Sequence, residues 1–333
     1  MMTIREKLLA LEASMNKQVI GQQELVRMLI VALLCDGHVL LEGLPGLAKT
    51  RAVRELAQHI EGEFCRIQFT PDLLPSDITG SEIYQQNATR EEDQFRFRPG
   101  PVFGNIILAD EINRASARVQ SALLEAMEER HVTVAGRTWP LPGIFMVLAT
   151  QNPVDQEGTW PLPEAQLDRF LMKVIVDYPT KENEQQVMQL VRAEQQAKYQ
   201  QSQPGRLPTD AEPLRISQQD IAACWQAIAS VYVAPTVEQY IVNLVEMTRR
   251  PEQVSEAFAG YISLGISPRG TLALDRCGRA LAWFEGRDAV MPEDIQRIAP
   301  AVLRHRLLLS YQANADNCTS DQAVRMLLDA VVA

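Results

Sequence analysis

The sequence predicts an α/β fold built on a parallel sheet, followed by a smaller all-helical domain. Between residues 38 and 177, short apolar runs alternate with longer segments of helical periodicity, the pattern of a parallel sheet covered on both faces. From Ile216 onward, apolar residues recur only at three-and-four spacing, which predicts helices and no further strand. We therefore expect an α/β core over residues 1–179, a connecting helix and linker over 180–212, and the helical domain over 213–333.

Five apolar runs predict buried strands, because they are rich in β-branched or aliphatic residues and are bounded by turn residues. They are "HVLLEG", "FCRIQF", "NIILADE", "FMVLATQ" and "MKVIVD". Two stretches, residues 79–103 and 131–143, alternate apolar and polar residues around turn signals, so they predict hairpins inserted into the core.

Composition favours a globular intracellular protein over a nucleic-acid binder. The 333 residues are 46% hydrophobic and 22% charged, and the formal net charge is −10, whereas backbone binding relies on clustered Lys and Arg. The longest apolar run, Met28 to Cys35, falls far short of the roughly 20 residues that cross a bilayer. The N-terminal segment lacks the apolar stretch of a signal peptide, so we expect a cytoplasmic protein.

The cysteines and histidines show no spacing typical of a metal or redox site. All five cysteines are isolated, and all four histidines are dispersed along the chain. We expect the cysteines to be small buried hydrophobic residues.

The stretch "GLPGLAKT" is close to the phosphate-binding pattern G-x-x-x-x-G-K-[ST]. It follows the predicted strand "HVLLE" and precedes a predicted helix, the context in which amide N–H groups of a turn can surround phosphate oxygens. Lys49 would reach the β- and γ-phosphates, and the Thr50 hydroxyl would bind Mg²⁺. An ordinary tight turn with a surface lysine is the alternative.

Ala48 departs from this pattern, which has glycine before the lysine. Because the position enters a helix, and alanine favours helical backbone angles, we expect the replacement to cost little.

Polar side chains end two further predicted strands. "NIILADE" places Asp110 and Glu111 at a strand end, where Asp110 would hold Mg²⁺ and Glu111 would act as general base toward the attacking water. "FMVLATQNP" places Asn152 at the same edge of the sheet, within reach of that water or the γ-phosphate. Acidic strand ends facing solvent are the alternative.

Six strings in order resemble the AAA+ ATPases, and among them the MoxR family. They are "VIGQ", "GLPGLAKT", "FRPGPVFGNIILADEINRA", "ATQNP", "LPEAQLDRF" and "SPRGTLAL", and they span essentially the whole chain. The resemblance implies ATP and Mg²⁺ as cofactors and the following nucleotide-binding residues: Ile20, Gly21, Gly43, Leu44, Pro45, Gly46, Leu47, Ala48, Lys49, Thr50 and Arg51.

The resemblance also assigns roles to residues far from the phosphate-binding turn. Ile20 and Gly21 would lie beside the adenine. Arg169 would be an arginine finger that reaches the γ-phosphate of a neighbouring subunit, with an ion pair to Asp168 or Glu164 as the alternative. Arg269 matches sensor 2 and would contact the γ-phosphate of its own chain.

The two predicted hairpins match inserts shared with the magnesium-chelatase ATPase subunits and replicative helicases. Such inserts face the pore of a ring or a partner. Tyr84, Phe95 and Phe97 are therefore candidate contacts, and packing beneath their own hairpin is the alternative.

The resemblance implies a ring-shaped homo-oligomer, usually of six subunits, that hydrolyses ATP to remodel, assemble or activate a client protein. A protein with a von Willebrand factor A domain is the implied partner. Two rival functions remain: a nucleic-acid motor, which the net charge of −10 disfavours, and a nucleotide-gated scaffold with little turnover.

Overall fold

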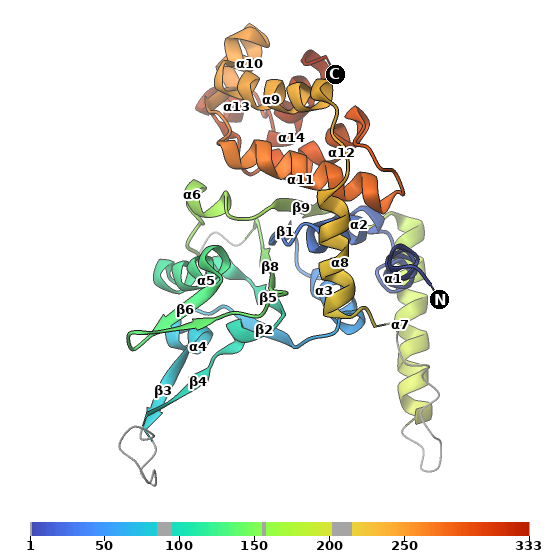
Figure 1. Ribbon diagram of the computed structural model, residues 1–333, viewed down its shortest axis with the longest axis vertical. Helices are drawn as coiled ribbons and strands as arrows, with labels where there is room; N and C mark the ends of the chain where they lie inside the picture. The colour runs from blue at the N-terminus through green and yellow to red at the C-terminus, as the bar shows by residue number, and fades with distance from the viewer. Residues whose placement is uncertain (1, 85–94, 155–157, 202–214, 333) are drawn as a thin grey trace.

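A computed structural model describes residues 2–84, 95–154, 158–201 and 215–332 (Figure 1). Most helices of the C-terminal helical domain, called the lid below, lie together above the α/β core. A hairpin of β3 (Gly80–Tyr84) and β4 (Phe95–Pro99) projects from the core, and the long helix α7 (Lys181–Gln201) runs along the opposite side. The predicted linker over residues 202–212 and the tip of the first hairpin, residues 85–94, lie outside the described residues.

All five predicted apolar runs form one parallel sheet, which confirms the predicted fold class. The strand order is β2-β5-β8-β1-β9, so β5, β8 and β1 are interior and their backbones pair on both sides. The strand bounds are β1 Val39–Gly43, β2 Phe64–Gln68, β5 Ile106–Asp110, β8 Met146–Gln151 and β9 Met172–Val176.

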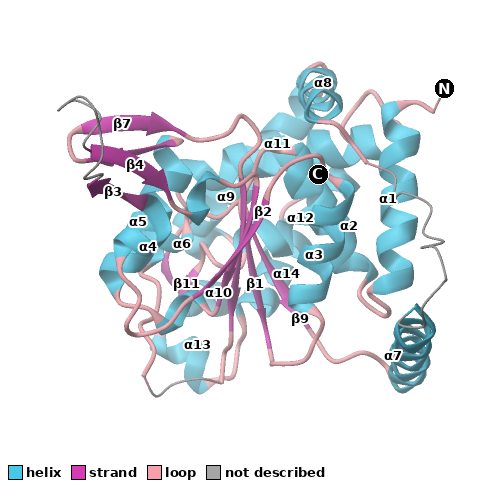
Figure 2. Cartoon of the chain, turned by 90° about the horizontal axis from the view of Figure 1, so that it is seen from below, coloured by secondary structure: helices cyan, strands magenta, loops and turns pink. Residues whose placement is uncertain are grey.

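Alternate residues of the three interior strands enter two apolar clusters, one on each face of the sheet. In β1, Val39 and Leu41 join the cluster with α1, α2 and α3, while Leu40 faces the cluster with α4 and α5. Figure 2 shows these two helical layers on either side of the strands. The helix bounds are α1 Ile4–Gln18, α2 Gln23–Leu34, α3 Lys49–His59, α4 Pro75–Thr79 and α5 Ala117–Glu129.

The two inserted segments form antiparallel hairpins that contact each other. Phe97 of the first stacks on Trp139 of the second, with ring centroids 4.6 Å apart, and its other neighbour is Phe103. Phe97 therefore packs within the hairpins, whereas Tyr84 and Phe95 are exposed and contact each other. The bounds are β3 Gly80–Tyr84 with β4 Phe95–Pro99, and β6 His131–Val134 with β7 Arg137–Pro140.

The C-terminal part is helical, but it also contains one short antiparallel strand pair. This corrects the expectation of helices only: β10 (Ile262–Leu264) pairs with β11 (Leu308–Leu309). Strands this short show no alternation in sequence, because their pairing is set by the packing of the helices around them. Its α-helices are α8 Gln218–Ala229, α9 Pro235–Arg249, α10 Glu256–Tyr261, α11 Pro268–Phe284, α12 Pro292–Leu303, α13 Tyr311–Ala315 and α14 Ser320–Ala330. Before it come α6 Glu164–Leu167 of the core and the connecting helix α7 Lys181–Gln201.

One apolar cluster runs without a break from the core into the lid. It contains buried residues of α2 and β9 together with those of α8, α11 and α12. Two hydrogen bonds add to the junction: Trp225 of α8 donates to the Leu33 carbonyl at 3.1 Å, and Arg5 of α1 donates to the Phe284 carbonyl at 3.1 Å. Among the described helices, none combines the length and the apolarity needed to span a bilayer.

Two buried histidines make stability depend on pH. His38 is satisfied as a neutral ring, because Nδ1 accepts the Val147 N–H at 3.0 Å and Nε2 lies 3.3 Å from the Met127 carbonyl. Burial, with repulsion from Arg130, lowers the pKa of His38 to about 3. Burial likewise lowers the pKa of His305.

We expect the free energy of unfolding to fall as pH drops below about 6.5, the pKa of an unfolded histidine. Between that value and the lowered folded pKa the unfolded chain binds more protons, so each such histidine costs about 1.4 kcal/mol per pH unit. Urea unfolding at pH 7 and pH 5 measures this slope. His38→Gln should reduce the slope and His131→Gln, in the β6–β7 hairpin, should not; an unchanged slope in His38→Gln would contradict the assignment.

Candidate active site

A cavity of about 270 Å³ lies at the carboxyl edge of the sheet, where β1, β5 and β8 end. The turn after β1 forms one wall, and the residues that end β5 and β8 form the other. The lining residues are Pro45, Gly46, Leu47, Ala48, Lys49, Thr50, Asp110, Glu111, Thr150, Gln151 and Asn152. The structure thus brings the predicted phosphate-binding turn, the two carboxylates and the amide into one cavity.

Two glycines give the turn its shape for different reasons. A Cβ on Gly43 would lie 2.5 Å from the Val176 carbonyl oxygen, so this position permits the close approach of β1 and β9. Gly46 has φ +85°, a left-handed conformation that glycine adopts without strain, and no atom lies within 4 Å of where a Cβ would stand. The space that a side chain would take at Gly46 is therefore empty and adjoins the cavity. Lys49 bends back over the turn, and its Nζ donates to the carbonyls of Gly43 and Leu44.

Ala48 has φ +60° and ψ +13°, which is left-handed and not helical. This corrects the expectation that alanine suits the position because it enters a helix: Ala48 is the N-cap, and α3 begins one residue later. A left-handed residue with a Cβ costs about 1–2 kcal/mol. The turn therefore keeps its shape at the expense of local strain that glycine would avoid.

Asp110 is buried at the end of β5, and both of its carboxylate oxygens accept hydrogen bonds. Its Oδ1 accepts the Thr150 hydroxyl at 2.6 Å, and its Oδ2 accepts Arg66 Nη2 at 2.6 Å. Arg66 comes from β2, the neighbouring strand, and balances the carboxylate charge. Thr150 also accepts the Glu111 N–H at 2.8 Å, so one hydroxyl orients both acidic residues.

Glu111 has a left-handed backbone conformation, with φ +58°, so the chain turns away from the direction of β5 at this residue. Gln68 of β2 donates to Glu111 Oε2 at 2.9 Å, and Arg114 lies 3.2 Å from the same oxygen. Glu111 is half-buried at the cavity wall, where an acidic group could meet a water beside the terminal phosphate. Asn152, also on the wall, is buried, and its Oδ1 accepts the Val154 N–H at 3.2 Å.

The oxygen ligands that line this cavity fit a nucleoside triphosphate with Mg²⁺. The Thr50 hydroxyl and the Asp110 carboxylate line the same cavity, and both offer the hard oxygen ligands that Mg²⁺ takes. Among the described residues, no group of three or more His, Cys, Asp or Glu could hold a metal ion.

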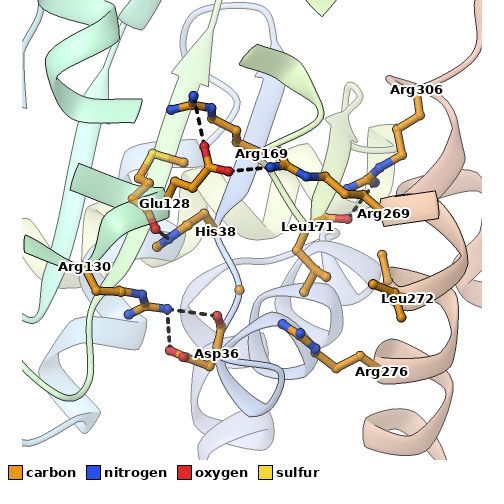
Figure 3. Close-up of a pocket in the computed structure, with 13 residues that line it drawn as sticks. Asp36, His38, Glu128, Arg130, Arg169, Leu171, Arg269, Leu272, Arg276 and Arg306 are labelled. Carbon is orange, nitrogen blue, oxygen red and sulfur yellow. Dashed lines mark hydrogen bonds and ion pairs between the residues drawn. The ribbon is translucent and has the colours of Figure 1, made fainter. Parts of the chain in front are cut away.

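A second cavity, of about 300 Å³, lies at the amino edge of the sheet (Figure 3). It is lined by residues that precede β1, that lie at or just after the end of α5, and that precede β9, together with one face of α11 and Arg306 after α12. Five arginines line it against two carboxylates, and the arginines are Arg130, Arg169, Arg269, Arg276 and Arg306. Because all five strands are parallel, this basic cavity and the phosphate cavity lie at opposite edges of one sheet.

Arg169 and Arg269 meet on one carboxylate, Glu128, near the end of α5. Arg169 Nη2 lies 2.9 Å from Glu128 Oε2, and Arg269 Nη2 is paired with Oε1. Arg169 also donates to the Leu124 carbonyl at 2.6 Å. Neither Asp168 nor Glu164, the ion-pair partners considered from sequence, takes Arg169.

Arg269 does not line the phosphate cavity of its own chain. The start of α11 lies instead at the amino edge of the sheet beside Arg169, so the expected contact with the γ-phosphate of the same chain stays a prediction that this arrangement does not support. Sequence could not show this, since the position of the lid depends on tertiary packing.

The remaining predicted residues lie around α7. Gly21 has φ +79°, and a Cβ there would come within 2.7 Å of Asn183 at the start of α7, with Ile20 next to it in the chain. Arg51 is paired with Glu194 of α7 and donates to Gln18 at 2.7 Å. These contacts tie the helix of the phosphate-binding turn to α1 and α7.

Comparison with known proteins agrees with this geometry. Residues 38–172 match the "ATPase family associated with various cellular activities (AAA)", and residues 255–327 match the "AAA lid domain". Chaperone MoxR1 of Mycobacterium tuberculosis is 45% identical over 314 residues, covering 94% of this chain and 78% of the relative. This chain belongs to the MoxR family of AAA+ ATPases.

Other MoxR-family relatives align over nearly the whole chain. Protein MoxR of Paracoccus denitrificans is 33% identical, covering 90% of this chain and 88% of the relative. The uncharacterized protein YeaC of Bacillus subtilis is 45% identical, covering 95% and 91%. A crystal structure from Cytophaga hutchinsonii, described as a candidate ATPase, superposes with a TM-score of 0.86 at 43% identity, covering 99% of this chain and 95% of that one.

Sequence reasoning missed Arg66, Gln68, Thr150 and Glu128. The first two lie in β2, which the sheet places beside β5 with Gln68 opposite Asp110. The sequence signal for Arg66 and Gln68 was two polar residues at alternate positions of an apolar strand. Only the strand order shows that they contact Asp110 and Glu111. Glu128 carried no signal, because a glutamate near the end of a helix is ordinary.

We expect Ala48→Gly to leave the MoxR-family chain at least as stable as the wild type. Removing the strained Cβ recovers about 1–2 kcal/mol, and the greater freedom of the unfolded chain offsets about 0.4–1 kcal/mol of it. Ala223→Gly, at an exposed position inside α8, should lose about 1 kcal/mol. Urea unfolding of both variants tests this; equal losses would show that Ala48 is unstrained.

Proposed function

We propose that this MoxR-family ATPase completes its active site only between subunits, and that it uses ATP hydrolysis to remodel or activate a client protein. The single observation behind the proposal is the placement of the two cavities. The phosphate-binding turn lies at the carboxyl edge of the sheet, and Arg169 and Arg269 lie at the amino edge. A chain with this arrangement supplies arginines to a neighbour and receives them from another, which generates a ring.

The main polar groups of the phosphate cavity have proposed tasks. Lys49 and the amides of the turn would hold the phosphates, and Thr50 and Asp110 would hold Mg²⁺, which when bound neutralises charge on the phosphate oxygens. Glu111 would accept a proton from the attacking water, which Asn152 helps to orient. Gln68, hydrogen-bonded to Glu111, would influence where that carboxylate points.

The client is proposed to be a protein, with a von Willebrand factor A domain protein as the first choice. The resemblance to the MoxR family suggests this partner, and the name Chaperone MoxR1 supports a client protein in general. The projecting β3–β4 hairpin offers a contact surface, because Tyr84 and Phe95 are exposed together on it. Aromatic residues exposed as a pair are typical of protein interfaces.

We expect specific ATPase activity to rise with protein concentration, because the arginines come from a second chain. Glu111→Gln and Arg169→Ala should each abolish turnover while ATP binding persists; an arginine supplied in trans is worth about 10³–10⁵ in rate. Arg325→Ala, on the exposed side of α14, removes the same charge from a residue that lines neither cavity and should keep wild-type activity. Turnover that is independent of concentration, with active Arg169→Ala, would contradict a shared site.

Mixing variants tests whether Arg269 also acts on the neighbour. Arg269→Ala keeps its own phosphate cavity, and Glu111→Gln keeps its arginines, so a mixture should regain activity that neither has alone. In a one-to-one mixture roughly a quarter of the interfaces join an intact cavity to intact arginines. If Arg269 acted within its own chain, these interfaces would stay inactive, and mixing would restore nothing.

A further inference from the structure

We propose that Arg306 and Asp168 are a positioning pair that fixes Arg169 and Arg269 as one unit facing the neighbouring subunit. The proposal rests on the shared active site described above, and it assigns to the lid a role in aligning arginines donated to another chain.

The guanidinium of Arg306 is almost fully buried, with 4% of its side chain exposed, and all of its donor nitrogens are used. Nε donates to Asp168 Oδ1 at 2.8 Å. Nη1 donates to the Leu171 carbonyl at 3.0 Å and to the carbonyl of Val302 in α12. Nη2 donates to the Phe170 carbonyl at 2.7 Å and to the Asp168 carbonyl at 3.4 Å.

These bonds surround the short segment that carries Arg169. Arg306 belongs to the lid, directly after α12, whereas residues 168–171 belong to the core, between α6 and β9. A single lid side chain therefore holds the carbonyls on both sides of Arg169. A guanidinium has five N–H groups in a fixed plane, so it defines the position of this segment more tightly than a flexible cation would.

Asp168 extends the connection to Arg269. Its second oxygen, Oδ2, accepts the Ser267 hydroxyl at 2.9 Å. Ser267 is the N-cap of α11, and Arg269 is the second residue of that helix. One carboxylate thus links the backbone turn before Arg169 to the helix start before Arg269.

The side-chain tips of the two arginines are joined separately. Both guanidinium groups meet on Glu128, as Figure 3 shows, and Arg306 lies behind them against Leu171. Two like charges are held together at their tips by Glu128 and at their backbones by Asp168 and Arg306. The pair is positioned before a phosphate arrives, and a displacement of about 1 Å in such a group costs on the order of 10²-fold in rate.

Arg306→Lys keeps the positive charge, but an ammonium group cannot form all of the hydrogen bonds that the guanidinium makes. At protein concentrations where activity per subunit no longer rises, we therefore expect kcat to fall about 10- to 100-fold. ATP affinity should stay within about twofold, because Arg306 does not line the phosphate cavity. Mixed with Glu111→Gln, Arg306→Lys should recover activity as Arg169→Ala does, since its own phosphate cavity is intact.

Ser267→Ala supplies a second, milder variant, so the test survives if Arg306→Lys fails to fold. We expect a lower kcat from Ser267→Ala and recovery in Ser267→Thr, which keeps the hydroxyl. Thr319→Ala removes an equivalent N-cap from α14 and should leave kcat unchanged.

Three results would overturn the proposal. Wild-type kcat in Arg306→Lys and Ser267→Ala would show that the Arg306–Asp168 pair does not position Arg169 and Arg269. A loss of kcat that Glu111→Gln does not complement, while Arg169→Ala is complemented, would show a folding defect and leave the shared site standing. Failure of Arg169→Ala itself to be complemented would remove the shared site and this proposal with it.

Discussion

The parallel sheet is the constraint on which the rest of the structure depends. Because all five strands run the same way, every turn after a strand falls at one edge and every turn before a strand at the other. The chain places its phosphate-binding turn at the first edge and its arginine-lined cavity at the second. One domain cannot bring these edges together without breaking its sheet, so the separation favours a second chain as the source of the arginines.

The residues at the carboxyl edge depend on backbone conformations that sequence patterns describe poorly. Ala48 and Glu111 both adopt left-handed angles directly after strands or turns. Each conformation changes the direction of the backbone. After Ala48 the chain enters α3, and after Asp110 the left-handed Glu111 ends the extended course of β5. Strain of this kind persists only where surrounding contacts hold it, and here the Thr150 hydroxyl bonds to both the Asp110 side chain and the Glu111 N–H.

Much of the fold and the phosphate cavity could be predicted, because their signals are local. Buried strands appear as apolar runs, and the loop, the acidic pair and Asn152 each follow such a run. What sequence could not supply was strand order and lid position. Arg66 and Gln68 matter because β2 lies beside β5, and Arg269 lies at the amino edge because the lid packs there. The β10–β11 pair was missed for a related reason, since each strand is too short to carry periodicity.

The attachment of the lid also bears on how hydrolysis could produce movement. A lid that swings over its own nucleotide needs a weak junction with the core, but here one apolar cluster continues through α2, β9, α11 and α12. Arg306 adds a buried ion pair across the same junction, and separating it would leave Asp168 without its cation. Both observations favour a lid that moves with its own core. A change at the phosphates would then pass between subunits, through the Arg169 and Arg269 of the next chain, and shift one rigid protomer against another.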